Sequence, residues 1–152
     1  AIIGKGGHEI SAASALQHVA GYSCYLDGSV RDWQRHTRQI TAGKNFNFTG
    51  GFGPWLVTAD EIPDPQVLDL STRLNGNVMQ QGNTRDMVFS VAELIEYCST
   101  WTTLEPGDVI VTGTPGGVGF KRNPPVFMKV GDVVEIMVEK VGTLVHHIER
   151  AP

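Results

Sequence analysis

The sequence has few of the residues that would point to a disulfide-rich, nucleic-acid-binding or membrane protein. Cys24 and Cys98 are its only cysteines, so we expect two buried free thiols and a cytoplasmic protein. Lys and Arg number 12 against 16 Asp and Glu, without a basic cluster, so we expect no nucleic-acid partner. No apolar run approaches the roughly 20 residues that a membrane-spanning helix needs, so we expect no membrane partner.

Common catalytic signatures are lacking as well. The serines have no nucleophile-elbow context, and the 5 histidines do not show the spacing of a His-Glu-x-x-His metal site. The glycine-rich residues 112–119 are not followed by the Gly-Lys-Ser/Thr of a phosphate-binding P-loop. These absences argue against a serine hydrolase, a histidine metal centre and a nucleotide-binding loop.

Glycine and proline are abundant. The 152 residues include 18 Gly and 8 Pro, and the glycine share is roughly double the usual value of about 7%. Glycine and proline without a collagen period indicate many turns between short strands. A hydrophobic share of 41% is enough to fill one core. We therefore predict a single α+β domain, mainly β, over residues 1–152.

Local patterns predict the elements of this domain. Asn75-Gly76 suits a type I′ turn between strands at residues 68–74 and 78–83. Ser90 and Glu93 form a capping box that opens a helix to about Thr100, with Val91, Leu94, Ile95 and Cys98 on its apolar stripe. Residues 27–53 form a long polar loop, which is more often functional than accidental. The other predicted elements are a short helix at 11–18 and strands at 19–26, 54–58, 109–111, 133–139 and 144–148.

Two carboxylates stand where the strand at residues 19–26 gives way to the polar loop. Asp27 and Asp32 are five residues apart, with Arg31 between them. Carboxylate oxygens suit a hard cation such as Mg²⁺, and the arginine suits an anionic ligand. An ordinary strand-end aspartate with a surface Arg–Asp ion pair explains the same residues. Both interpretations stay open on the local sequence.

Two further segments could bind an anion. Backbone N–H groups and threonine hydroxyls of residues 112–119 could hold a carboxylate, although a tight structural turn has the same composition. Lys44 could neutralise an enolate or a carboxylate, although most lone lysines simply face solvent. Neither segment identifies a function alone.

Three separated segments carry motifs of one known family. Residues 21–34 are similar to the signature Gly-Tyr-x-x-x-Asn-Asp-x-Ser-Ala-Arg-Asp-x-Gln, residues 43–58 to segments with Gly-Lys-Ser-Phe and Gly-Pro-Trp, and residues 104–115 to Leu-x-Pro-Gly-Asp-x-Ile-x-Thr-Gly-Thr-Pro. These are motifs of the C-terminal catalytic domain of the fumarylacetoacetate hydrolase family. The resemblance runs from Ile2 to about Ile148. It implies a mixed β-sandwich roll with a few short helices, commonly a homodimer.

The resemblance also implies a site. By position, Asp27 resembles the metal-ligand aspartate, Lys44 the catalytic lysine beside the metal, and Arg31, Gln34 and Thr114 the substrate-binding residues. The cofactor of the family is Mg²⁺, or Mn²⁺ or Ca²⁺, and the substrates are 2-oxo acids such as acylpyruvates. The resemblance implies a divalent-metal-dependent hydrolase that cleaves a C–C bond through an enolate.

Some of the family pattern is not matched. Leu26 and Gly28 replace the residues that often flank the metal aspartate. The family places a Glu-x-Glu ligand pair, and in hydrolases a base on a lid, before the strand that ends at Ile2-Ile3-Gly4. We therefore expect the 152 residues to lack this N-terminal part of the site and to be inactive alone. A decarboxylase or isomerase of 2-oxo-diacids or 2-hydroxy-dienedioates, and a noncatalytic dimerisation or ligand-binding domain, remain alternatives.

Overall fold

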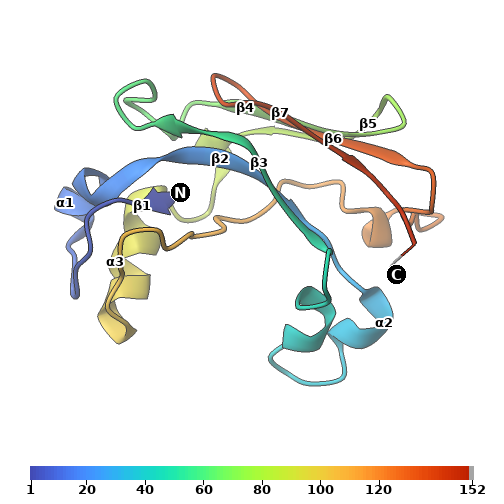
Figure 1. The fold of residues 1–152 in the computed structure, drawn as a ribbon, viewed down its shortest axis with the longest axis horizontal. Helices are drawn as coiled ribbons and strands as arrows, with labels where there is room; N and C mark the ends of the chain where they lie inside the picture. Colours follow the sequence, from blue (N-terminus) through green and yellow to red (C-terminus); the bar gives the residue numbers. More distant parts are fainter. Residues whose placement is uncertain (151–152) are drawn as a thin grey trace.

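Two antiparallel sheets form the fold in the computed structural model, which describes residues 1–150. The first sheet has the order β1-β2-β3, and the second has the order β5-β4-β6-β7. Figure 1 shows the sheets together forming an arch over the helices and the long loop. The strands are β1 (Ile2–Ile3), β2 (Val19–Asp27), β3 (Gly50–Thr58), β4 (Asp69–Leu74), β5 (Asn77–Asn83), β6 (Val133–Val138) and β7 (Gly142–His147). The mainly β fold class is confirmed.

The helices are short except for α3. They are α1 (Ala12–Ala15), η1 (Leu16–His18), α2 (Arg31–Gln34), η2 (Thr41–Lys44), η3 (Thr84–Asp86), α3 (Val91–Trp101) and η4 (Gly119–Lys121). The predicted capping box begins α3: Ser90 Oγ accepts from the N–H of Glu93 at 3.2 Å, and Glu93 Oε2 accepts from the N–H of Ser90 at 2.7 Å. In the described part of the chain, no helix is both long and apolar enough to cross a membrane.

The Asn-Gly hairpin forms as predicted. Asn75 and Gly76 have φ values of 51° and 79°, and these positive angles are those of a type I′ turn. The turn joins β4 to β5, and β4 also pairs with β6 along its other edge. The last two predicted strands, at 133–139 and 144–148, form β6 and β7, which pair with Val138 opposite Gly142.

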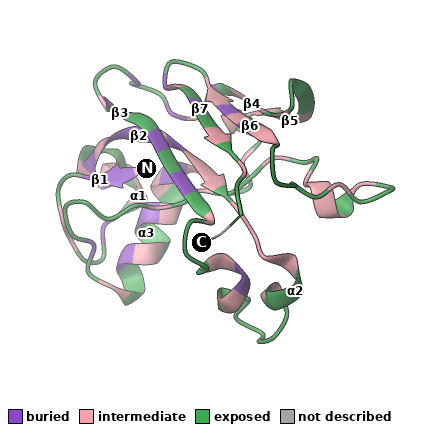
Figure 2. Ribbon diagram, turned by 45° about the vertical axis from the view of Figure 1, so that its right-hand side comes forward, coloured by how far each residue is buried: buried purple, intermediate pink, exposed green. Residues whose placement is uncertain are grey.

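The core lies between the sheets and against α3, where Figure 2 shows the buried positions. Its most buried side chains include Ile3, Cys24, Ile62, Ile95 and Val141. Both cysteines are free, as predicted, but Cys98 is only partly buried. Burial raises the pKa of the Cys24 thiol and keeps it protonated, so a cysteine nucleophile is disfavoured here.

The predicted apolar stripe of α3 needs one correction. Val91 and Ile95 are buried, but Leu94 and Cys98 are only half-buried, and Ser99 is fully buried instead. Ser99 tolerates burial because its hydroxyl is satisfied: it accepts from the N–H of Ile10 at 2.9 Å and donates to the carbonyl of Glu96 at 3.0 Å.

Two strand predictions were wrong in part. Residues 109–111 do not form a buried strand, because β1 has only two residues and Val109 pairs with it at one isolated bridge. Val109 and Val111 are 42% and 49% exposed, since they border the open underside of the arch. The third strand begins at Gly50 rather than Pro54, because residues 50–53 pair with the end of β2. The predicted polar loop is therefore shorter and contains α2 and η2.

Candidate functional site

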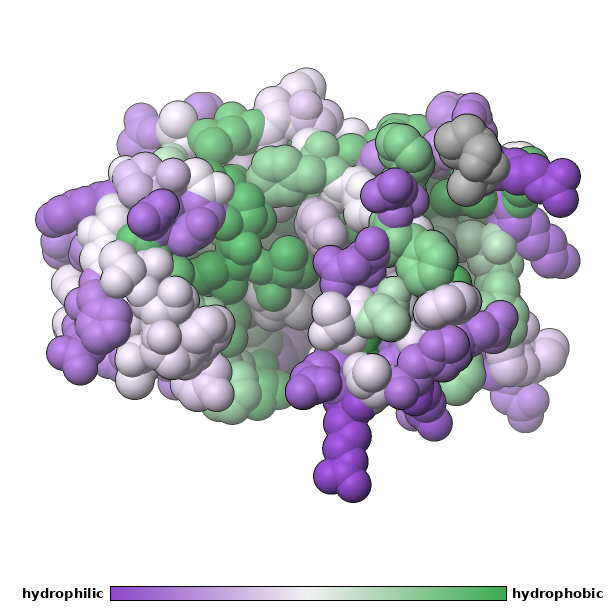
Figure 3. All heavy atoms as spheres, turned by 60° about the horizontal axis from the view of Figure 1, so that its bottom comes forward, coloured by the Kyte–Doolittle hydropathy of each residue, from purple (hydrophilic) through white to green (hydrophobic). Residues whose placement is uncertain are grey.

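All the residues predicted for the site line one cavity beneath the arch. The cavity has a volume of about 940 Å³, and Asp27, Arg31, Gln34, Lys44 and Thr114 all contribute to its wall. Residues of β2, the segment 109–120 and apolar residues of β4 and β6 form much of the remaining wall. Figure 3 shows hydrophobic side chains gathered around a recess on this face, with hydrophilic side chains at its border. A mostly apolar concavity with a few converging polar groups is typical of a small-molecule site.

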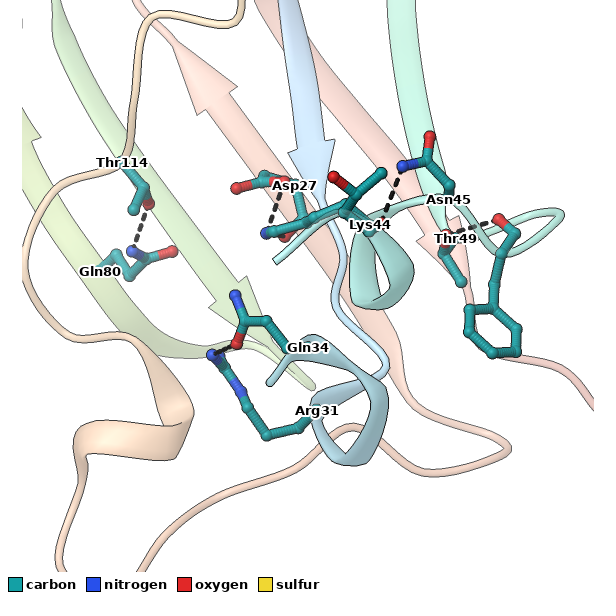
Figure 4. A network of polar contacts seen from close by, with 10 residues as sticks. Asp27, Arg31, Gln34, Lys44, Asn45, Thr49, Gln80 and Thr114 are labelled. Atoms are coloured by element: carbon teal, nitrogen blue, oxygen red, sulfur yellow. Dashed lines mark hydrogen bonds and ion pairs between the residues drawn. The ribbon is translucent and has the colours of Figure 1, made fainter. Parts of the chain in front are cut away.

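Asp27 and Lys44 form an ion pair at this wall (Figure 4). Asp27 ends β2, and Lys44 ends η2. The Nζ of Lys44 lies 2.7 Å from Asp27 Oδ1 and 3.4 Å from the Asp27 carbonyl oxygen. The Lys44 side chain is 28% exposed and the Asp27 side chain 44%, so the pair contributes about 1 kcal/mol or less to stability. A pair that stabilises the fold so little can rearrange around a ligand at low energetic cost.

Gly43 determines where Lys44 lies. A Cβ added to Gly43 would be 2.6 Å from the Cα of Gln34, so only glycine lets η2 pack this closely on α2. The Gly43 carbonyl also accepts from the N–H of Val30 at 2.9 Å, just before α2 begins. The polar segment thus brings Lys44 and Gln34 to the same wall, although they are ten residues apart in sequence.

Gly43→Ala should therefore separate η2 from α2. We expect a loss of stability of about 1–3 kcal/mol, because the new methyl group would meet backbone rather than a flexible side chain. Ligand affinity should fall as well, because Lys44 moves. Thermal unfolding and ligand titration measure the two effects. Gly116→Ala is the matched control, since its Cβ would meet nothing within 4 Å; equal behaviour of the two variants would contradict this role for Gly43.

Arg31 is held from two sides. Its Nη1 donates a hydrogen bond to Gln34 Oε1, and its guanidinium lies 4.6 Å from the ring centroid of Phe120 in η4. Arg35 approaches the same ring at 5.9 Å. A cation–π contact and a hydrogen bond fix the direction of a long side chain that would otherwise sample many rotamers. The sequence pattern did not reveal Phe120, because nothing local connects it with α2.

Arg31→Lys should weaken binding of an anionic ligand although the charge is kept. Lysine lacks the planar fork that can bond a carboxylate with two N–H groups, and its contact with Phe120 would differ. We expect affinity to fall about tenfold or more, since a hydrogen bond to a charged group is worth about 1.5–3 kcal/mol. Titration of a small carboxylate ligand measures the change, with Arg150→Lys at an exposed position as the control. Wild-type affinity in Arg31→Lys would contradict a fork-like role.

Thr114 lies in the glycine-rich loop and contacts β5. Its Oγ1 accepts a hydrogen bond from Gln80 Nε2 at 2.8 Å, and the same nitrogen donates to the carbonyl of Pro115 at 2.9 Å. Figure 4 shows this pair from β5 and the loop together with the groups around Asp27. Gln80 was not among the predicted residues, because a polar residue in an edge strand has no distinctive local signal.

Asp27 fits one ligand position of a divalent-cation site. It offers a partly exposed carboxylate at the cavity wall, and hard cations prefer such oxygens. Within residues 1–150, however, no group of three or more His, Cys, Asp or Glu side chains is arranged to hold a metal ion. Among the described residues, Asp27 is thus a candidate ligand without a complete coordination sphere around it.

Comparisons with known proteins found similar sequences over nearly the whole chain. A family profile described as fumarylacetoacetate (FAA) hydrolase C-terminal matches residues 1–149. A mitochondrial oxaloacetate tautomerase from Bos taurus is 47% identical over 149 residues, which are 97% of this chain and 48% of that protein. The chain spans about half the length of the curated relatives it matches.

Solved structures show the same fold. A fumarylacetoacetate hydrolase from Exiguobacterium antarcticum superimposes with a TM-score of 0.95 at 39% identity, over 99% of this chain and 54% of that one. A fumarylpyruvate hydrolase from Pseudomonas aeruginosa, in complex with Mn²⁺ and pyruvate, has a TM-score of 0.87 at 32% identity, over 98% of this chain and 62% of that one.

Proposed function

The chain belongs to the fumarylacetoacetate hydrolase family, and on that premise we propose that it forms part of an enzyme that converts a 2-oxo acid through an enolate. The observation that carries the proposal is the convergence of Asp27, Lys44, Arg31, Gln34 and Thr114 on one cavity, from segments far apart in sequence. Positive and hydrogen-bonding groups beside the carboxylates of Asp27 and Asp32 suit an anionic, oxygen-rich ligand.

The proposed cofactor is a divalent cation, Mg²⁺ or alternatively Mn²⁺ or Ca²⁺, with Asp27 as one ligand. When bound, the cation would supply Lewis-acid polarisation of the 2-oxo group. We further propose that the remaining carboxylate ligands are a Glu-x-Glu pair outside these 152 residues. The Mn²⁺ and pyruvate bound by the Pseudomonas aeruginosa relative support this choice of cofactor and ligand.

The residues of this chain have distinct roles in the proposal. Lys44 would place its ammonium near the oxygen that becomes negative, and such stabilisation of developing charge is often the largest catalytic contribution. Arg31, oriented by Gln34 and Phe120, and the hydroxyl of Thr114 would hold the substrate carboxylate. Fixing the substrate in this way converts binding energy into correct orientation.

The reaction we propose is hydrolysis of an acylpyruvate such as fumarylpyruvate. Water adds to the distal carbonyl carbon, and the C–C bond between that carbon and the pyruvyl methylene breaks. The bonding electrons pass to the methylene carbon as a pyruvate enolate, which a proton then converts to pyruvate. The other product is the carboxylic acid, so atoms and charge balance. Lys44 beside Asp27 would stabilise the enolate in this step.

A specific observation favours a second candidate, tautomerisation of a 2-oxo diacid such as oxaloacetate. Tautomerisation needs enolate stabilisation and proton transfer but no activated water. Lys44 and Thr114 line the cavity and would serve this reaction as well, one by stabilising the enolate and the other by holding a carboxylate. The Bos taurus relative, an oxaloacetate tautomerase, supports this reading.

One assay of the full-length protein separates the outcomes. With Mg²⁺ or Mn²⁺ present, release of pyruvate and acid from fumarylpyruvate supports the hydrolase. Faster loss of the enol absorbance of oxaloacetate without pyruvate formation supports the tautomerase, and pyruvate with CO₂ would indicate a decarboxylase. No metal-dependent turnover of any of these 2-oxo acids would contradict the proposal.

We also propose that the protein is a homodimer. The exposed apolar side chains Trp55, Leu56 and Val145 on β3 and β7 support this, since apolar surface of this kind often marks an interface. Light scattering of the purified full-length protein tests the proposal: a monomer at micromolar concentration would contradict it.

A further inference from the structure

We propose that Gln80 is a positioning residue for Thr114: it makes the threonine hydroxyl a hydrogen-bond donor toward the carboxylate of the bound 2-oxo acid. The inference rests on the proposed function, which supplies the carboxylate ligand. It concerns the contact between Gln80 in β5 and the loop that carries Thr114.

The direction of the Gln80 amide follows from its partners. The carbonyl oxygen of Pro115 can only accept hydrogen bonds, so the amide group 2.9 Å away must be the nitrogen. The same nitrogen lies 2.8 Å from Thr114 Oγ1. Each of its two hydrogens then has one partner, and an amide nitrogen does not accept. The Thr114 oxygen is therefore the acceptor of this hydrogen bond, and its own hydrogen must point elsewhere.

The hydrogen of the Thr114 hydroxyl can point into the cavity. Thr114 is exposed and lines the cavity, and among residues 1–150 the hydrogen bond from Gln80 is the only one that its side chain makes. Lys44 and Arg31 lie in the wall of the same cavity, where their N–H groups can bind an anion beside the carboxylates of Asp27 and Asp32. A ligand carboxylate, which only accepts when ionised, would complete the hydrogen bond that the Thr114 hydroxyl has left to give.

Backbone interactions of β5 and the loop hold Gln80 and Thr114 together, so their hydrogen bond does not depend on two mobile side chains. Gln80 is paired with Thr72 in β4, and the loop is fixed along the outer edge of β5. Gly117, with φ of 102°, packs so closely that an added Cβ would be 2.2 Å from the carbonyl oxygen of Met79. Arg122 donates to that same carbonyl and, through Nε, to the carbonyl of Gly117 at 3.2 Å. Gln80 and Thr114 are thus held in register by their backbones.

Gln80→Glu tests the inference, because glutamate has nearly the same shape but can only accept when ionised. The Thr114 hydroxyl would turn toward the new carboxylate and no longer point into the cavity. In the full-length protein with Mn²⁺, we expect pyruvate affinity to fall about tenfold to a hundredfold, as for loss of a hydrogen bond to a charged group. In turnover assays, KM should rise more than kcat falls. Gln81→Glu is the matched control, since it adds the same charge at the exposed neighbouring position.

A double-mutant cycle with Thr114→Val separates orientation from charge repulsion. If Gln80 acts through Thr114, Gln80→Glu should weaken pyruvate binding much less in the Thr114→Val background than in the wild type. An equal loss in both backgrounds, or unchanged affinity in Gln80→Glu alone, would overturn the inference. If Gln80→Glu does not fold, Gln80→Met replaces it: loss of the fixed donor should again weaken pyruvate binding, and only when Thr114 is present. A wild-type protein that binds no pyruvate with Mn²⁺ would instead refute the proposed function, and this inference with it.

Discussion

Replacing Asp27 with alanine should lower metal-dependent turnover by about a thousandfold or more. Loss of a group that only orients a metal ligand already costs about tenfold to a hundredfold, and Asp27 is proposed to be a ligand itself. The fold should change little, because the carboxylate is 44% exposed and, among residues 1–150, its ion partner is the Nζ of Lys44 at 2.7 Å. Calorimetry with Mn²⁺ and the melting temperature measure the two effects separately.

Asp32→Ala is the informative comparison for this prediction. Asp32 also lines the cavity and would be the alternative ligand in the same segment. If Asp32→Ala loses metal affinity while Asp27→Ala keeps it, the ligand has been assigned to the wrong carboxylate. If Asp27→Ala strongly lowers the melting temperature as well as the activity, the Asp27–Lys44 pair stabilises the fold instead.

Lys44→Met should lower kcat by about a hundredfold to a thousandfold, with a smaller change in KM. Removing one group that stabilises developing negative charge typically has an effect of this size on kcat. Methionine keeps most of the length and apolar volume of the side chain, so η2 should stay in place on α2. Steady-state kinetics with the substrate identified for the wild type measure both constants.

Lys5→Met is the control, because Lys5 is exposed and does not line the cavity. An effect of Lys44→Met on KM alone would assign Lys44 to carboxylate binding rather than to the enolate. Free Asp27 in this variant should also bind Mn²⁺ without first displacing the ammonium. Tighter metal binding together with slower turnover would therefore be consistent with the catalytic role.

The sequence predicted those parts of the fold that depend on neighbouring residues. The Asn75-Gly76 turn and the capping box of Ser90 and Glu93 are confirmed, because each is decided within four residues. The start of β3 and the lack of a strand at residues 109–111 were missed, because pairing with a distant strand decides both. Local β-propensity contains no information about how long that partner strand is.

The same limit applies to the candidate site. The motifs located Asp27, Arg31, Gln34, Lys44 and Thr114, and the fold brings them to one cavity, but their roles stay predictions. The residues that orient them, Gln80 and Phe120, come from segments 34 and 89 positions away from the groups they contact, Thr114 and Arg31. Such partners have ordinary local surroundings, so only a three-dimensional arrangement identifies them.

The packing of the Thr114 loop on β5 also affects resistance to aggregation. As an edge strand, β5 would present free backbone groups that could template pairing with another chain. Gly117 packs on the carbonyl of Met79 and Arg122 donates to it, so part of this edge is already covered. A substitution that loosens the loop that carries Thr114 would therefore also uncover a strand edge to which a partly unfolded neighbour could add.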